Sequence, residues 1–189
     1  MIWMKISGIS GIIAPIIAFT SILLAIVYSP SFSWKENALS DLGVQEGVTA
    51  VLFNTGLIIS GILAILFATG LFTFLQGNLL GRIGALVLVL DAFALVAIGV
   101  FPENVKPVHF YASVAFFTLF PISLLFLGTA FLRTSKMKSG LFTFIVAIVA
   151  AIVWIIPFGR GVAIPETLSA LSASTWAIIL GFKMLQLQC

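Results

Sequence analysis

The stretch RIGALVLVLDAFALVAIGVF (residues 82–101) decides the structural class of this protein. After Arg82, its only charged residue is Asp91, and all the others are apolar or small. A helix of about 20 such residues is long enough to cross the hydrocarbon core of a bilayer. Inside that core every backbone polar group must bond within the segment, and a helix meets this requirement. The stretch therefore predicts a transmembrane helix.

Similar apolar runs recur along the whole chain, each bounded by charge, proline or glycine. Of the 189 residues, 61% are hydrophobic and only 8% are charged, whereas soluble domains are about 25% charged. So few charges cannot cover the surface of a soluble globule. We expect an all-α, polytopic membrane protein: one domain over 1–189, with six helices in a bundle and a short amphipathic helix in an outer loop. The expected spans are 5–29, 50–75, 81–101, 109–133, 139–157 and 165–185.

Basic residues are divided unevenly between the two sides of the membrane. Because six spans place both termini on one side, each loop can be assigned to a side. Lys and Arg are enriched in cytoplasmic loops, so the side with more of them is expected to be cytoplasmic. This predicts a multi-pass protein of the cell membrane with both termini in the cytoplasm. The terminal side carries Lys5, Arg82, Arg133, Lys136, Lys138 and Lys183, and the other side carries Lys35, Lys106 and Arg160.

Small residues recur at every fourth position in the second and sixth spans, so each set follows one helix face. Helices in lipid associate by close packing of small residues. We interpret both stripes as helix–helix contacts; the alternative is a ligand groove lined by small residues. The stripes are Gly56, Ser60, Ala64 and Ala68, and Ser169, Ala173, Ala177 and Gly181.

The longest polar stretch, SWKENALSDLG (residues 33–43), lies outside the membrane between the first two spans. Ser33 and Glu36 have the spacing of a capping box, and Gly43 suits the position just beyond a helix end. These signals predict a short amphipathic helix across the mouth of the bundle. Its polar side chains either contact a ligand or only cap helix ends and hold the loop. They are Asn37, Ser40 and Asp41.

Three motifs together resemble a known family. They are NALSDLG (37–43), LFNTGLIISGIL (52–63) and FPENVKPVHFYA (101–112). The combination resembles the prokaryotic membrane proteins grouped as domain of unknown function 998, over nearly the whole chain. This resemblance implies six helices but no established activity. The SDLG loop is also distantly similar to the corresponding loop of Frag1/DRAM/Sfk1-type membrane proteins, which are linked to lipid and membrane-trafficking roles.

A set of polar residues forms the candidate ligand-binding site. Asp91 lies near the middle of the third span, where a carboxyl group costs on the order of 3 kcal/mol and should point into the bundle. It either forms an interhelical hydrogen bond, for which Ser60, Ser172, Ser174 and Thr175 are candidates, or serves a ligand or an ion. Arg160 is expected to pair with an outer carboxylate. The full set is Asn37, Ser40, Asp41, Asn54, Asp91, Glu103, His109 and Arg160.

These residues favour a non-enzymatic protein that binds a lipid-like or amphipathic ligand in an outward-facing pocket, or a subunit of a membrane complex. One alternative is a lipid-directed hydrolase or transferase, with Ser40, His109 and a carboxylate as its machinery. Another is a small transporter that uses Asp91. One Cys and one His do not make a metal site, and no cofactor is expected. The expected partners are membrane lipids and a membrane protein or second copy; scattered basic residues argue against nucleic acid.

Overall fold

The computed structural model describes residues 2–186, and the prediction of an all-α membrane protein with six spanning helices is confirmed. No strand occurs within 2–186. Each long helix is long and apolar enough to cross a bilayer, with α5 counted together with η2. The α-helices are α1 (Ile2–Val27), α2 (Val48–Phe74), α3 (Leu79–Val100), α4 (Val108–Arg133), α5 (Met137–Ile152) and α6 (Ala163–Gln186). Two 3₁₀-helices are η1 (Leu39–Val44) and η2 (Val153–Ile155).

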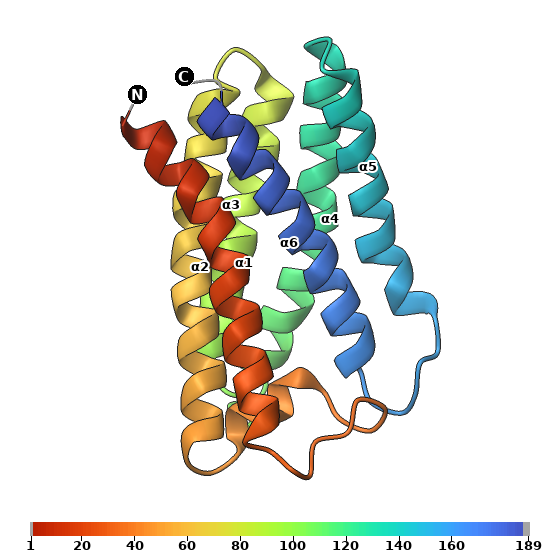
Figure 1. Ribbon diagram of the computed structural model, residues 1–189. Helices are drawn as coiled ribbons and strands as arrows, with labels where there is room; N and C mark the ends of the chain where they lie inside the picture. Colours follow the sequence, from red (N-terminus) through yellow and green to blue (C-terminus); the bar gives the residue numbers. More distant parts are fainter. Residues whose placement is uncertain (1, 187–189) are drawn as a thin grey trace.

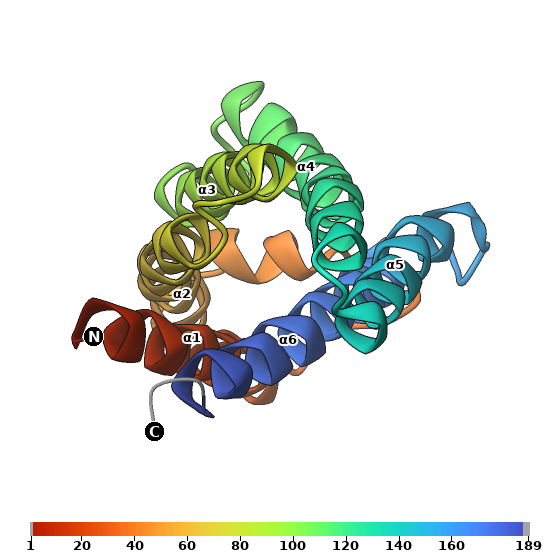
Figure 2. The same ribbon diagram turned by 90° about the horizontal axis from the view of Figure 1, so that it is seen from above.

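The helices α1 to α4 follow one another around a ring, which α6 closes by packing against α1 (Figures 1 and 2). Helix α5 packs beside α4 and α6, outside this ring. Both termini lie at one end of the bundle, which we call the terminal end. Residues 28–47, the cap segment, cross the opposite end beneath the ring, and we call that the capped end.

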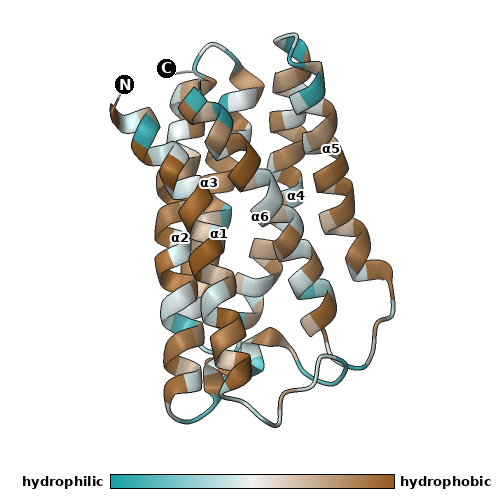
Figure 3. Cartoon of the chain, in the orientation of Figure 1, coloured by the Kyte–Doolittle hydropathy of each residue, from teal (hydrophilic) through white to brown (hydrophobic). Residues whose placement is uncertain are grey.

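Hydrophobic residues, coloured brown, make up most of every helix between the two ends of the bundle (Figure 3). Large exposed residues occur on every helix, for example Ile16, Leu86, Leu125 and Ile148. In water such a surface would aggregate, whereas in a bilayer it contacts lipid chains of the same polarity. The chain is therefore a multi-pass membrane protein.

Small residues bring the helices into close contact where they cross. A Cβ atom at Gly181 of α6 would lie 2.6 Å from the carbonyl oxygen of Gly8 on α1, so this crossing leaves no room for a side chain. Gly56 of α2 packs in the same way against Ser21 of α1. Both glycines belong to the stripes noted in the sequence, and their role in helix contacts is confirmed. The middle of each stripe instead faces the interior of the ring.

The cap segment differs from the helix expected over residues 34–42. Ser33 does not start an α-helix; its carbonyl accepts turn hydrogen bonds from Glu36 and Asn37. The regular part is the 3₁₀-helix η1, with Gly43 inside it rather than beyond its end. The physical reason is competition from the Asn37 and Asp41 side chains, which bond to nearby backbone and to each other.

Enlarging Gly181 should separate α6 from α1 and open the ring. We expect Gly181→Val to lower the free energy of unfolding by about 1–3 kcal/mol, as overpacking does elsewhere. Thermal unfolding in detergent measures this. The matched control is Gly77→Val, because a Cβ atom at Gly77 would have nothing within 4 Å of it, and this change should alter stability by less than about 0.5 kcal/mol. Equal effects of the two substitutions would contradict the role given to this crossing.

Candidate functional site

The ring of helices encloses a cavity of about 150 Å³ at its centre. Small side chains on α1, α2 and α6 leave this space open, because alanine fills little volume. The cavity walls are mostly apolar, and only a few polar residues from the cap segment, α2, α3, α4 and α6 reach them. The alanines that α1, α2 and α6 contribute to the wall are Ala14, Ala18, Ala64, Ala170, Ala173 and Ala177.

A second, larger hollow of about 980 Å³ lies beside the cavity, between α4, the end of α5 and the start of α6. We call it the lateral cleft. Exposed apolar residues such as Val114 and Trp154 line it, so its walls suit lipid chains. Four residues line both hollows, which places the cavity and the cleft next to each other. These residues are Ser40, Ser113, Phe117 and Glu166.

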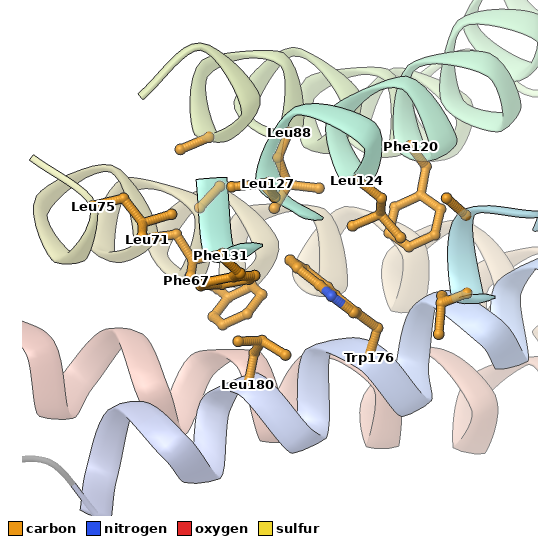
Figure 4. Packing of buried hydrophobic residues seen from close by; sticks show 14 of the residues in the cluster. Phe67, Leu71, Leu75, Leu88, Phe120, Leu124, Leu127, Phe131, Trp176 and Leu180 are labelled. Atoms are coloured by element: carbon orange, nitrogen blue, oxygen red, sulfur yellow. The ribbon is translucent and has the colours of Figure 1, made fainter. Parts of the chain in front are cut away.

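Towards the terminal end, the cavity is closed by a packed apolar core. Trp176, only 1% exposed, makes edge-on ring contacts with Phe67 and Phe120, and its indole N–H donates to the hydroxyl of Thr143 at 3.0 Å. Leucines from α2, α3, α4 and α6 fill the space around these rings (Figure 4). The cavity is therefore blind at its inner end.

Three carboxyl groups meet where the cap segment crosses the cavity mouth. The backbone N–H of Leu39 donates to Glu166 Oε2 at 2.6 Å, and Ser40 Oγ donates to Glu103 Oε2 at 3.2 Å. Asp41 and Glu103 share a hydrogen bond, and the negative charges of both interact unfavourably with the carboxyl group of Glu166. Burial, together with the hydrogen bond and negative charge of Asp41, raises the pKa of Glu103. The mouth thus gathers three carboxyl groups that disfavour one another's negative charge.

The cap segment is held in place by its own polar groups and by the loop before α6. Asn37 Nδ2 donates to Asp41 Oδ2 at 2.7 Å, and the Asn37 carbonyl accepts from the N–H of Ala163 at 2.9 Å. The carbonyl of Lys35 accepts from the N–H groups of Arg160 and Gly161. These bonds fix the position of the mouth. Asn37 and Asp41 therefore stabilise the cap segment, and neither residue lines the cavity or the cleft.

His109, at the start of α4, lines the cleft and is 5% exposed. Its Nδ1 lies 2.7 Å from the carbonyl oxygen of Phe101. Because a carbonyl only accepts, Nδ1 must carry the proton and donate it. This leaves Nε2 as the nitrogen available to a molecule in the cleft. Ser40 donates to Glu103 instead of to His109, so the set proposed for nucleophilic catalysis is not assembled.

Two further sequence-predicted residues, Asn54 and Arg160, line neither hollow. Asn54 Nδ2 donates to the Gly43 carbonyl at 2.9 Å and so attaches η1 to α2. Arg160 is exposed, and within residues 2–186 it forms no ion pair with Asp41, Glu103 or Glu166. The expected pairing is therefore wrong: the backbone of Arg160 is bound to Lys35, and its side chain points to solvent.

Asp91 faces the cavity from α3 and is 4% exposed. Its carboxyl lies beside the backbone of Phe120 on α4, and its Oδ1 has no hydrogen-bond partner among the described residues. The expected hydrogen bonds to neighbouring hydroxyls are not formed: Ser172 and Thr175 donate within their own helix. Ser60 lines the same cavity, and its hydroxyl also lacks a partner.

Glu166 is the main site residue that the sequence prediction left out. Its signal was present, since a carboxylate in the first turn of an apolar helix requires a partner or a special position. What the sequence did not reveal is that the partner is the backbone of Leu39, far away in the chain. Phe117 and Ser113 were also missed, because an apolar or small residue in a transmembrane helix gives no sign of lining a hollow.

Comparison with known proteins identifies the family but not an activity. No curated protein and no solved structure matches the chain. The family described as "Protein of unknown function (DUF998)" matches over residues 12–183, which is nearly the whole chain, from within α1 to within α6. The distant likeness to Frag1/DRAM/Sfk1-type proteins stays an expectation. The chain belongs to the DUF998 family of proteins of unknown function.

Proposed function

We propose that this protein binds a single-chain amphipathic, lipid-like molecule. The apolar chain of the ligand occupies the cavity, and its headgroup lies at the mouth between the cap segment and α6. The observation that carries this proposal is that the cleft and the cavity lie next to each other and share four lining residues, Ser40, Ser113, Phe117 and Glu166. In this proposal the chain enters from the lipid along the apolar walls of the cleft and passes between these four residues into the cavity.

The carboxyl groups at the mouth support a headgroup that donates hydrogen bonds or carries an amine. Glu103 and Glu166 both line the cleft, and no Lys or Arg among residues 2–186 forms a salt bridge with them. Each carboxyl accepts one hydrogen bond from the cap segment, which leaves further lone pairs that can accept from a headgroup. An amino group at the mouth would supply the missing positive charge, with Lys106 and His109 on the α4 side of the cleft.

The alternative functions gain less support. A transporter needs a polar path past Asp91 to both ends, and the core around Trp176 and Leu180 fills the terminal half. A hydrolase needs a hydroxyl activated by a base, and Ser40 donates to a carboxylate in place of His109. The role of a subunit in a membrane complex stays a prediction without a specific surface to support it.

We also propose that the capped end faces outward and that both termini are cytoplasmic. All carboxylates except Asp91 lie at the capped end, whereas most basic residues lie at the terminal end. Lys and Arg favour the cytoplasmic side during insertion. In this orientation the ligand enters from the outer leaflet.

Labelling of single cysteines tests this orientation. In a Cys189→Ala background, Glu46→Cys at the capped end should react with an impermeant maleimide on intact cells. Lys138→Cys at the terminal end should react only after permeabilisation. Both positions are exposed, so the two variants serve as controls for each other. The opposite labelling pattern would reverse the orientation.

Quenching of Trp176 tests entry of a chain into the cavity. In a variant with Trp3, Trp34 and Trp154 replaced by Phe, the remaining Trp176 is shielded from bulk lipid and borders the cavity. We expect a lipid with a brominated chain to quench its fluorescence, and Ser113→Phe to remove most of the quenching by blocking the passage.

The matched control for that block is Thr129→Phe, a half-buried position on the same helix that lines neither hollow. It should leave quenching unchanged. An absence of quenching in the starting variant, or equal quenching with Ser113→Phe, would contradict the proposal.

Binding of a long-chain alkyl amine should depend on pH through Glu103. The pKa of Glu103 is raised, so its negative charge appears only above the ordinary titration range of a glutamate. As the pH rises through this pKa, the amine should bind about threefold to fivefold more tightly, as expected for a partly exposed pair. The groups that face Glu103 are Asp41, Ser40 and His109, with Glu166 nearby.

Titration calorimetry in detergent at a series of pH values measures this change. Glu103→Gln should flatten the pH dependence, and Glu46→Gln, which removes an exposed carboxylate at the same end, should retain it. A full dependence in Glu103→Gln would show that another group is responsible.

A further inference from the structure

Two polar oxygens on the cavity wall have no hydrogen-bond partner among residues 2–186. They are Oδ1 of Asp91 on α3 and Oγ of Ser60 on α2. Both side chains are almost fully buried, with 4% and 1% exposed. A buried polar group without a partner costs about 1–3 kcal/mol, so two of them on one cavity require an explanation.

Ser60 behaves differently from most hydroxyls of the bundle. Thr55, Thr69 and Ser172 each donate to a backbone carbonyl three or four residues earlier in their own helix, which satisfies a hydroxyl in lipid. Ser60 does not. The hydroxyls of Ser7 and Ser29 and the Oδ1 atom of Asn54 also lack a partner, but none of these residues lines the cavity. Among the described residues, Asp91 and Ser60 alone combine an unpartnered oxygen with a position on the cavity wall.

The two oxygens lie well below the mouth of the cavity. Asp91 precedes the end of α3 at Val100 by nine residues, which is about 14 Å along a helix. Between these levels the wall is apolar, with residues such as Leu95 and Ile98. The site therefore has polar groups at both ends and an apolar middle.

We infer that the ligand carries a hydrogen-bond donor, such as a hydroxyl, at the buried end of its apolar chain. Asp91 Oδ1 would accept from this hydroxyl and the Ser60 hydroxyl would donate to its oxygen, while the headgroup stays at the carboxyl cluster. The inference rests on the proposed ligand site and narrows its ligand to amphiphiles that are polar at both ends. A plain hydrocarbon end would leave both oxygens unsatisfied in the bound state, and so it should bind less well.

Competition between two synthetic probes tests the inference. One probe is a long-chain alkyl amine, and the other is the same amine with a hydroxyl at the far end of the chain. Each displaces a brominated lipid from the variant with Trp176 as its only tryptophan, and recovery of fluorescence reports displacement. Chains of graded length are compared, because the hydroxyl must reach Asp91. At the best length, the hydroxylated amine should compete about tenfold better, because the plain chain leaves two buried polar groups without a hydrogen bond.

The variants Asp91→Leu and Ser60→Ala separate the inference from a general effect on folding. Asp91→Leu should abolish the preference for the hydroxylated probe while the plain amine still displaces the brominated lipid, which also shows that the cavity is intact. Ser60→Ala should reduce the preference. Equal competition by the two probes in the parent protein would overturn the inference and leave the proposed ligand site standing. Failure of both probes to displace the lipid would overturn the ligand site itself.

Discussion

The hydrogen bond from the Leu39 N–H to Glu166 connects the two polar segments at the capped end, and the rest of the site depends on it. It joins the cap segment to the first turn of α6. Backbone bonds between Lys35 and the loop at Arg160 and Gly161 reinforce the connection. The glycines there are needed for close approach, since a Cβ at Gly159 would lie 2.5 Å from the Lys35 carbonyl oxygen. Together these bonds hold a polar segment over the apolar cavity.

The same packing explains why the bundle has a hollow interior only in part of its length. Small residues serve two purposes in α2 and α6. At crossings such as Gly8 with Gly181 they allow backbones to touch, whereas Ala64 and Ala173 leave space on the inner face. Near the terminal end, Phe67, Trp176 and several leucines fill that space. A bundle of large residues throughout would close completely, and one of small residues throughout would lack a core.

Much of this architecture could be predicted from the sequence because the bilayer imposes a simple rule on span length and polarity. Run lengths and flanking charges predicted the six helices and their bounds within a few residues. The side chains of the site were harder. Ser40, Asp91, Glu103 and His109 were predicted because polar residues in or beside an apolar span require a reason, and all four line a hollow. Asn54 and Arg160 were predicted for the same reason, but Asn54 attaches the cap segment to α2 and the Arg160 side chain lies in solvent. Which oxygen meets which N–H depends on contacts between distant segments, and no local pattern encodes them.

Native mass spectrometry of the protein, extracted gently from its own membrane, tests the central claim most directly. The account predicts one amphipathic molecule bound per chain, retained through mild activation and lost when Ser113→Phe blocks the passage between cleft and cavity. Its mass and fragments would also show whether it is polar at both ends. A chain that carries no such molecule, or one that retains it equally well with the passage blocked, would contradict the account.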